Sequence, residues 1–86
     1  IYRRLDNQPN IANAYCHLGR IYQEWGKYEQ AIFYYQQGLD IHKQLNREQD
    51  VANLWDSISE CYRDLSKYEQ AIECLQNCLQ MNQRLN

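Results

Sequence analysis

The hexapeptide Lys-Tyr-Glu-Gln-Ala-Ile occurs twice in this chain, at residues 27–32 and again at residues 67–72. When the sequence is shifted by 40 positions, residues 11–46 superimpose on residues 51–86, and thirteen of the 36 aligned pairs are identical. Other pairs are conservative, such as Tyr15 with Trp55 and Leu18 with Ile58. A match of this length does not arise by chance, so the chain contains two copies of one structural unit.

Each copy has the hydrophobic spacing of two helices. The first half of the first copy places apolar residues at i, i+4, i+7, i+11 and i+14, one stripe of a helical period: Ile11, Tyr15, Leu18, Tyr22 and Trp25. A second stripe starts at Tyr28, and the second copy repeats both. The turns at 26–27 and 66–67 are so short that the flanking helices must be antiparallel neighbours. We expect helices near residues 8–25, 28–45, 48–65 and 68–85.

The units themselves are expected to span residues 7–46 and 47–86. Residues 1–6 align with residues 41–46, so we expect them to be the tail of the second helix of an earlier unit. The chain also starts at Ile1 rather than at a methionine, and we expect it to be part of a longer protein. A repeat needs neighbours to bury its apolar faces, and the stripe of the helix expected at 68–85 has no polar capping helix after it.

The composition favours helices and excludes several kinds of partner. The 86 residues include only 3 Gly and 1 Pro, which predicts an all-α fold. The net charge is −2, and the 9 basic and 11 acidic residues are mixed along the chain, without the basic stripe of a nucleic-acid-binding protein. No apolar run approaches the roughly 20 residues that span a bilayer. We therefore expect neither a nucleic acid nor a membrane as a partner.

The four cysteines are Cys16, Cys61, Cys74 and Cys78, and their spacing matches neither a secreted disulfide scaffold nor a zinc ribbon. A cytoplasmic, reducing location is the expectation. Zinc usually requires four ligands with a close Cys-x2-Cys pair, whereas Cys74 and Cys78 are four residues apart. We interpret the cysteines as inert thiols and expect no metal and no cofactor.

No catalytic constellation is evident in the sequence. His17 and His42 lie in different environments, and no Ser, Cys or Asp stands in an evident sequence relation to either. We therefore expect a protein that binds and is not an enzyme.

The sequence resembles the tetratricopeptide repeat (TPR) family. The first copy reads Tyr15-x-x-Leu18-Gly19-x-x-Tyr22, followed by Ala31, Tyr35 and Gly38, and the second reads Trp55-x-x-Ile58-Ser59-x-x-Tyr62, followed by Ala71, Leu75 and Cys78. Small residues in this pattern let helix axes approach while large residues fill the gaps. The family period is about 34 residues, and its usual proline is replaced by Lys43 and Arg84. The longer period resembles the variant found in kinesin light chains and in large bacterial signalling proteins.

This resemblance implies a right-handed superhelix of antiparallel helix-turn-helix units, a solenoid fragment whose concave face is lined mainly by the first helix of each unit. A peptide or partner protein binds there in the family. The corresponding positions in this chain are Asn13, Cys16, His17, Arg20, Glu24, Asn53, Asp56, Ser57, Glu60 and Asp64.

These positions carry one arginine against four carboxylates, so we expect them to repel a carboxylate terminus and to favour a basic or neutral partner. An alternative is that they are ordinary solvated residues, with Arg20 and Glu60 paired between neighbouring helices.

Phe33 and Tyr34 break the repeat, because Glu73 and Cys74 stand at the same positions of the second unit. One hypothesis is an exposed aromatic patch for a partner, and the alternative is extra packing against a neighbouring helix. Two functions follow for the whole chain. It can be an interaction scaffold within a longer array, or a structural module that forms homo-oligomers through the uncapped ends of its repeats.

Overall fold

The computed structural model describes the backbone of residues 8–85 and the side chains of residues 10–80. Four α-helices make up this part: α1 (Gln8–Trp25), α2 (Tyr28–Gln44), α3 (Glu48–Asp64) and α4 (Tyr68–Leu85). Helices α2 and α3 each end one residue before the expected position. The fold is all-α over the described residues, and the tail expected at residues 1–6 lies outside them.

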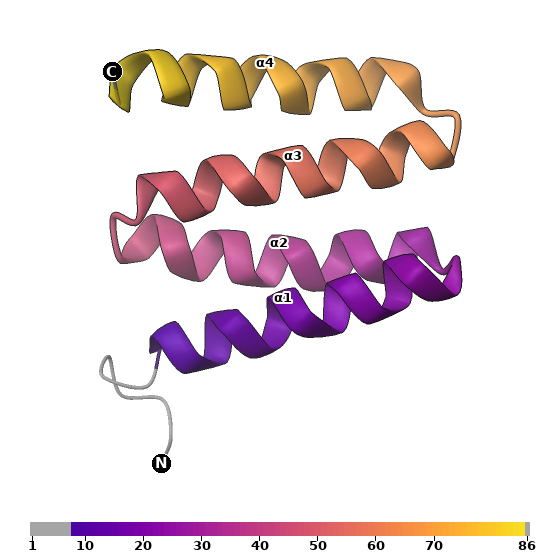
Figure 1. Cartoon of the computed structure of the whole chain (residues 1–86), viewed down its shortest axis with the longest axis horizontal. Helices are drawn as coiled ribbons and strands as arrows, with labels where there is room; N and C mark the ends of the chain where they lie inside the picture. The colour runs from indigo at the N-terminus through magenta and orange to yellow at the C-terminus, as the bar shows by residue number, and fades with distance from the viewer. Residues whose placement is uncertain (1–7, 86) are drawn as a thin grey trace.

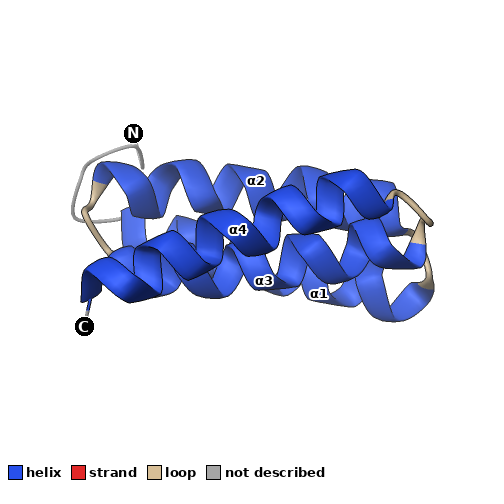
Figure 2. Cartoon of the chain, turned by 90° about the horizontal axis from the view of Figure 1, so that it is seen from above, coloured by secondary structure: helices blue, strands red, loops and turns tan. Residues whose placement is uncertain are grey.

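The helices stack in chain order as antiparallel neighbours (Figure 1). The stack is a slab with dimensions of 39 × 34 × 14 Å. Helix α2 packs against both α1 and α3, and α3 packs against both α2 and α4, so α2 and α3 are the inner helices. Viewed from above, the long axes of the helices run along the slab (Figure 2). None of the described helices combines the length and apolarity needed to cross a membrane.

The three turns are built in the same way. Each has one residue in the left-handed region: Gly26 (φ 88°) directly after α1, and Asn46 (φ 59°) and Ser66 (φ 63°) two residues after the last residue of α2 and of α3. At the first turn the Lys27 N–H donates to the Tyr22 carbonyl at 2.8 Å, and the Gly26 N–H donates to the Gln23 carbonyl at 3.1 Å. The other two turns have the same pair of bonds. This is the Schellman motif, which satisfies the last carbonyls of a helix and reverses the chain.

The core is continuous across the two inner helices. It consists of Ala31, Ile32, Tyr35, Leu39, Val51, Leu54, Ile58, Cys61 and Cys74. Glycines permit the close approach of α1 to α2. A Cβ atom on Gly19 would lie 2.8 Å from the Tyr35 ring, and one on Gly38 would lie 3.3 Å from the Ala12 carbonyl oxygen. The small residues of the repeat pattern therefore have a packing role in the first unit.

The two outer helices each have an exposed apolar face. Helix α4 exposes Tyr68, Ile72, Leu75 and Leu79, and α1 exposes Leu18, Ile21 and Trp25. Except for Ile21, these residues belong to the apolar stripes of the sequence pattern. The physical reason for their exposure is that the described residues place no helix outside α1 or α4. The inner helices have such neighbours, and the matching residues Ile32, Leu39 and Ile58 are buried.

Candidate binding site

A hollow of about 290 Å³ lies between α1 and α3. Helix α1 contributes Asn13, Cys16, His17 and Arg20, α3 contributes Asp50, Asn53, Leu54 and Ser57, and α2 contributes Tyr35 and His42. The hollow thus brings together one part of the predicted site: Asn13, Cys16, His17, Arg20, Asn53 and Ser57. The other predicted residues, Glu24, Asp56, Glu60 and Asp64, do not line it.

Two asparagines occupy the same position of each repeat and line the hollow from its two walls. Asn13 and Asn53 are both exposed. The side-chain oxygen Oδ1 of Asn53 accepts a hydrogen bond from Nε2 of Gln49 at 3.4 Å. The backbone carbonyl of Asn53 accepts one from the hydroxyl of Ser57 at 3.3 Å. An asparagine side chain carries both a donor and an acceptor, the combination that a peptide backbone presents. The pair is therefore suited to hold an extended segment from both sides.

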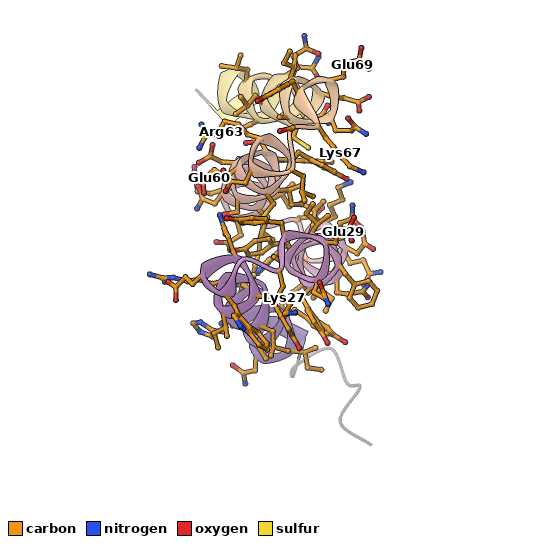
Figure 3. The ribbon with its side chains drawn as sticks, turned by 90° about the vertical axis from the view of Figure 1, so that its right-hand side faces the viewer. Lys27, Glu29, Glu60, Arg63, Lys67 and Glu69 are labelled. Atoms are coloured by element: carbon orange, nitrogen blue, oxygen red, sulfur yellow. The ribbon has the colours of Figure 1, made fainter. Side chains whose placement is uncertain are left out.

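A hydrogen-bond chain ties the three helices around the hollow. The Tyr35 hydroxyl donates to Oε1 of Gln23 at 2.7 Å, and Nε2 of Gln23 donates to Oε1 of Glu60 at 3.2 Å. Arg20 instead pairs with Glu24 on its own helix, with Nε 3.6 Å from Oε2. The alternative interpretation paired Arg20 with Glu60, whereas the structure pairs Arg20 with Glu24 and bonds Glu60 to Gln23. Figure 3 shows Glu60 and Arg63 on one side of the slab and Glu29 and Lys67 on the other.

Two charged or titratable residues of the hollow, His42 and Asp50, were not among the residues predicted from the sequence. His42 is 3% exposed, and its Nδ1 lies 3.8 Å from Oδ2 of Asp50. Burial lowers the pKa of His42, and the nearby carboxylate of Asp50 opposes that shift. The sequence does contain a signal for the histidine. Position 42 follows Tyr35 and Leu39 on the buried stripe of α2, where a polar residue needs an explanation.

The four cysteines are buried or half-buried in this structure. None of the four, all within the described residues, forms a disulfide. Burial raises the pKa of Cys61 to about 12 and that of Cys74 to about 11, so both remain thiols at neutral pH. The thiol of Cys78 donates to the Ala52 carbonyl at 3.4 Å. Across the described residues, no group of three or more His, Cys, Asp or Glu side chains could hold a metal ion.

The two aromatic residues that break the repeat have different environments. Phe33 is 55% exposed, whereas Tyr34 is half-buried and stacks on Tyr22, with ring centroids 5.4 Å apart. Tyr15 also stacks on the Tyr34 ring, with centroids 6.2 Å apart. Tyr34 therefore contributes packing between α1 and α2, and only Phe33 presents most of its ring to solvent.

Two family models match the chain. A tetratricopeptide repeat model matches residues 1–44, and a second tetratricopeptide repeat model matches residues 52–84. The chain belongs to the tetratricopeptide repeat family. No curated protein matches it closely enough to count as a relative.

Membership of the TPR family accounts for the stacked helix pairs and for the small residues between them. TPR units generally mediate protein–protein interactions and are non-catalytic modules. The 40-residue spacing between the two units stays a feature of the sequence, and its assignment to the kinesin light chain variant stays a prediction.

Proposed function

We propose that this chain is an interaction scaffold that binds a peptide segment of a partner protein in the hollow between α1 and α3. The observation that supports this most is the position of Asn13 and Asn53. They are the same residue at the same place in both repeats, and both line the hollow. Repeated asparagines on the two walls of the hollow can hold the backbone of a segment whatever its side chains are. No catalytic role is part of this proposal.

The charge around the hollow supports a basic or neutral segment as the ligand. Asp50 lines the hollow itself, and Asp56, Glu60 and Asp64 lie further along α3. Arg20 is the only arginine or lysine among the lining residues, and Glu24 pairs with it. A carboxylate-bearing segment would meet like charge here, whereas a basic one would be attracted. Because these are exposed charges, the preference should weaken as salt is added.

The test uses peptides selected from a displayed random library against the wild-type chain. The double substitution Asn13→Ala with Asn53→Ala should weaken the selected peptides at least about tenfold, the equivalent of about 1.4 kcal/mol. The matched control is Gln30→Ala with Gln70→Ala. These glutamines are also identical between the repeats and exposed, and they do not line the hollow. Equal binding by the asparagine variant and the wild type would reject the proposal.

A second candidate function, self-association, is favoured by the exposed apolar ends. The α4 face with Ile72 and Leu79 corresponds by repeat position to the α2 face that packs on α3. The α1 face with Leu18 and Ile21 corresponds to the α3 face that packs on α2. We propose that the α4 face of one copy packs on the α1 face of another, repeating the α2–α3 contact. Such head-to-tail contacts do not close, so they give chains of copies.

Sedimentation velocity across a range of protein concentrations tests this second candidate. The sedimentation coefficient should rise with concentration in the wild type and stay that of a monomer in Leu79→Glu. A wild-type chain that is monomeric up to high micromolar concentration rejects it.

A further inference from the structure

A buried ring nitrogen and a carboxylate oxygen lie close together in the hollow without a hydrogen bond between them. Nδ1 of His42 and Oδ2 of Asp50 are 3.8 Å apart, which is longer than the roughly 2.7–3.2 Å of a direct hydrogen bond. Among the described residues, this buried ring nitrogen has no hydrogen-bond partner. An unsatisfied buried group of this kind is unfavourable. The arrangement therefore favours a ligand that brings a donor to this point.

The charge states of the two side chains define that donor. Burial lowers the pKa of His42, so the imidazole is neutral at pH 7 and keeps one acceptor nitrogen. Asp50, whose side chain is 47% exposed, is an acceptor through both oxygens. Nη1 of Arg47 is 3.9 Å from the same Oδ2, also beyond hydrogen-bond length. A positively charged donor satisfies both the carboxylate and the imidazole.

The geometry suits a single nitrogen atom that carries several hydrogens. Two acceptors 3.8 Å apart are closer than twice the usual hydrogen-bond length of about 2.9 Å, so one atom can bond to both. An ammonium group has three donors on one atom. Asp50 is half-exposed and lines the hollow, so its carboxylate is accessible to such a group.

The walls of the hollow suit the rest of a lysine side chain. Leu54 and Tyr35, each 5% exposed, line the hollow together with Cys16. A lysine carries its ammonium on a four-carbon stem that packs well on apolar surface of this type. The hollow thus offers an apolar wall for the stem and two acceptors for the tip.

We propose that the hollow is a lysine pocket: a lysine of the partner segment inserts its ammonium group between Nδ1 of His42 and Oδ2 of Asp50, with Nδ1 as the acceptor nitrogen. This inference rests on the proposed function, since it requires a segment bound between α1 and α3. It adds the side chain that the segment must carry. Asn13 and Asn53 hold the backbone of the segment while the lysine fills the hollow.

The test uses the N-acetylated pentapeptide amide Gly-Ser-Lys-Ser-Gly as the probe, titrated into the ¹⁵N-labelled chain and followed by NMR. The matched peptide has norleucine, which has the same stem without the ammonium group. The lysine peptide should shift the side-chain nitrogen resonances of His42 and bind with a Kd on the order of 1 mM. The norleucine peptide should bind at least about tenfold more weakly, a difference of about 1.4 kcal/mol.

Two protein variants locate the pocket. Asp50→Asn removes the charge of a half-exposed residue and should weaken the lysine peptide at least about tenfold. Asp40→Asn changes the same residue type at an exposed position of α2 outside the hollow and should leave binding unchanged. Circular dichroism checks that both variants keep their helices. Equal binding of the lysine and norleucine peptides, or wild-type binding by Asp50→Asn, overturns the lysine pocket.

The failure of this inference is distinguishable from failure of the proposed function. A library-selected peptide can keep its affinity when norleucine replaces its lysine, while its binding still depends on Asn13 and Asn53. In that case the lysine pocket is wrong and the binding of a segment in the hollow stands. If the asparagine double variant binds normally, the proposed function itself is wrong.

Discussion

Leu39 and Leu79 occupy the same position of the two repeats, yet Leu39 is 4% exposed and Leu79 is 60% exposed. Ile32 and Ile72 differ in the same way, at 7% and 54%. The residues and their helices are alike, and the difference is the neighbour: α2 is covered by α3, whereas the described residues place no helix over the matching face of α4. In a repeat array, the stacking of units rather than the residue type decides what a hydrophobic position contributes.

The largest effect is expected from truncating these two leucines. Leu39→Ala should destabilise the chain by about 2–5 kcal/mol, because it removes buried methyl groups and leaves a cavity at the α2–α3 contact. Leu79→Ala should change stability by no more than about 0.5 kcal/mol, since its side chain is mostly in water already. Urea unfolding followed by circular dichroism measures both. Similar losses of stability for the two variants would show that the α4 face is covered and would contradict this comparison of the two repeats.

A smaller effect is expected from Gly19→Ala. The added methyl group would lie 2.8 Å from the Tyr35 ring and should cost about 1–3 kcal/mol by overpacking. At the matching position of the second unit, Ser59 is tolerated, and Leu75 stands where the first unit has Tyr35. In a Tyr35→Leu background the Gly19→Ala cost should therefore fall well below its value in the wild type. A double-mutant cycle that shows no coupling between the two positions would contradict overpacking of the new methyl group against Tyr35.

One substitution in a turn is expected to raise the stability of the chain rather than lower it. Ser66 has φ 63°, a conformation that costs a non-glycine residue about 1–2 kcal/mol. Ser66→Gly should stabilise the chain by about 1 kcal/mol. Gly26→Ser places the same residue type at the matching turn, where φ is 88°, and should destabilise by a similar amount. Thermal unfolding of both variants checks the pair, and a destabilised Ser66→Gly would contradict the shared turn geometry.

The smallest effect should come from pH. The pKa of His42 is lowered by burial, so the unfolded chain binds a proton at this residue more readily than the folded chain does. Stability is therefore fully present above the ordinary histidine pKa of about 6.5 and declines as the pH falls below it.

Urea unfolding at a series of pH values measures how the free energy of unfolding changes with pH. His42→Asn, which installs the residue found at position 82, should flatten this dependence, whereas His17→Asn should leave the His42 contribution in place. Stability that rises as the pH falls through this range would contradict the burial of a neutral His42.

The repeat made most of the fold predictable. A period that recurs with identical residues identifies both the helices and their pairing, and the two helix ends that differ from expectation do so by one residue. What the pattern could not provide is the environment of a position whose neighbour is outside the repeat. Trp25 belongs to an apolar stripe and is 67% exposed, because burial depends on a packing partner that a single helix pattern does not specify.

The candidate site was predictable only in part, for a related reason. Positions facing one side of α1 and α3 follow from helical geometry, and they include Asn13 and Asn53. His42 was missed because it comes from α2 and meets Asp50 only through the stacking of the second unit on the first. Residues that converge from three helices are specified by tertiary contacts rather than by spacing along one helix.

The most direct test of the account is chemical-shift mapping of the ¹⁵N-labelled chain with one library-selected peptide. Binding in the hollow predicts the largest shifts at Asn13, Cys16 and Asn53, on its two walls, with little change at Leu79 on the outer face of α4. Shifts confined to Ile72 and Leu79, with the two asparagines unaffected, would contradict it. The peptide would then occupy the exposed end of the stack and not the hollow between α1 and α3.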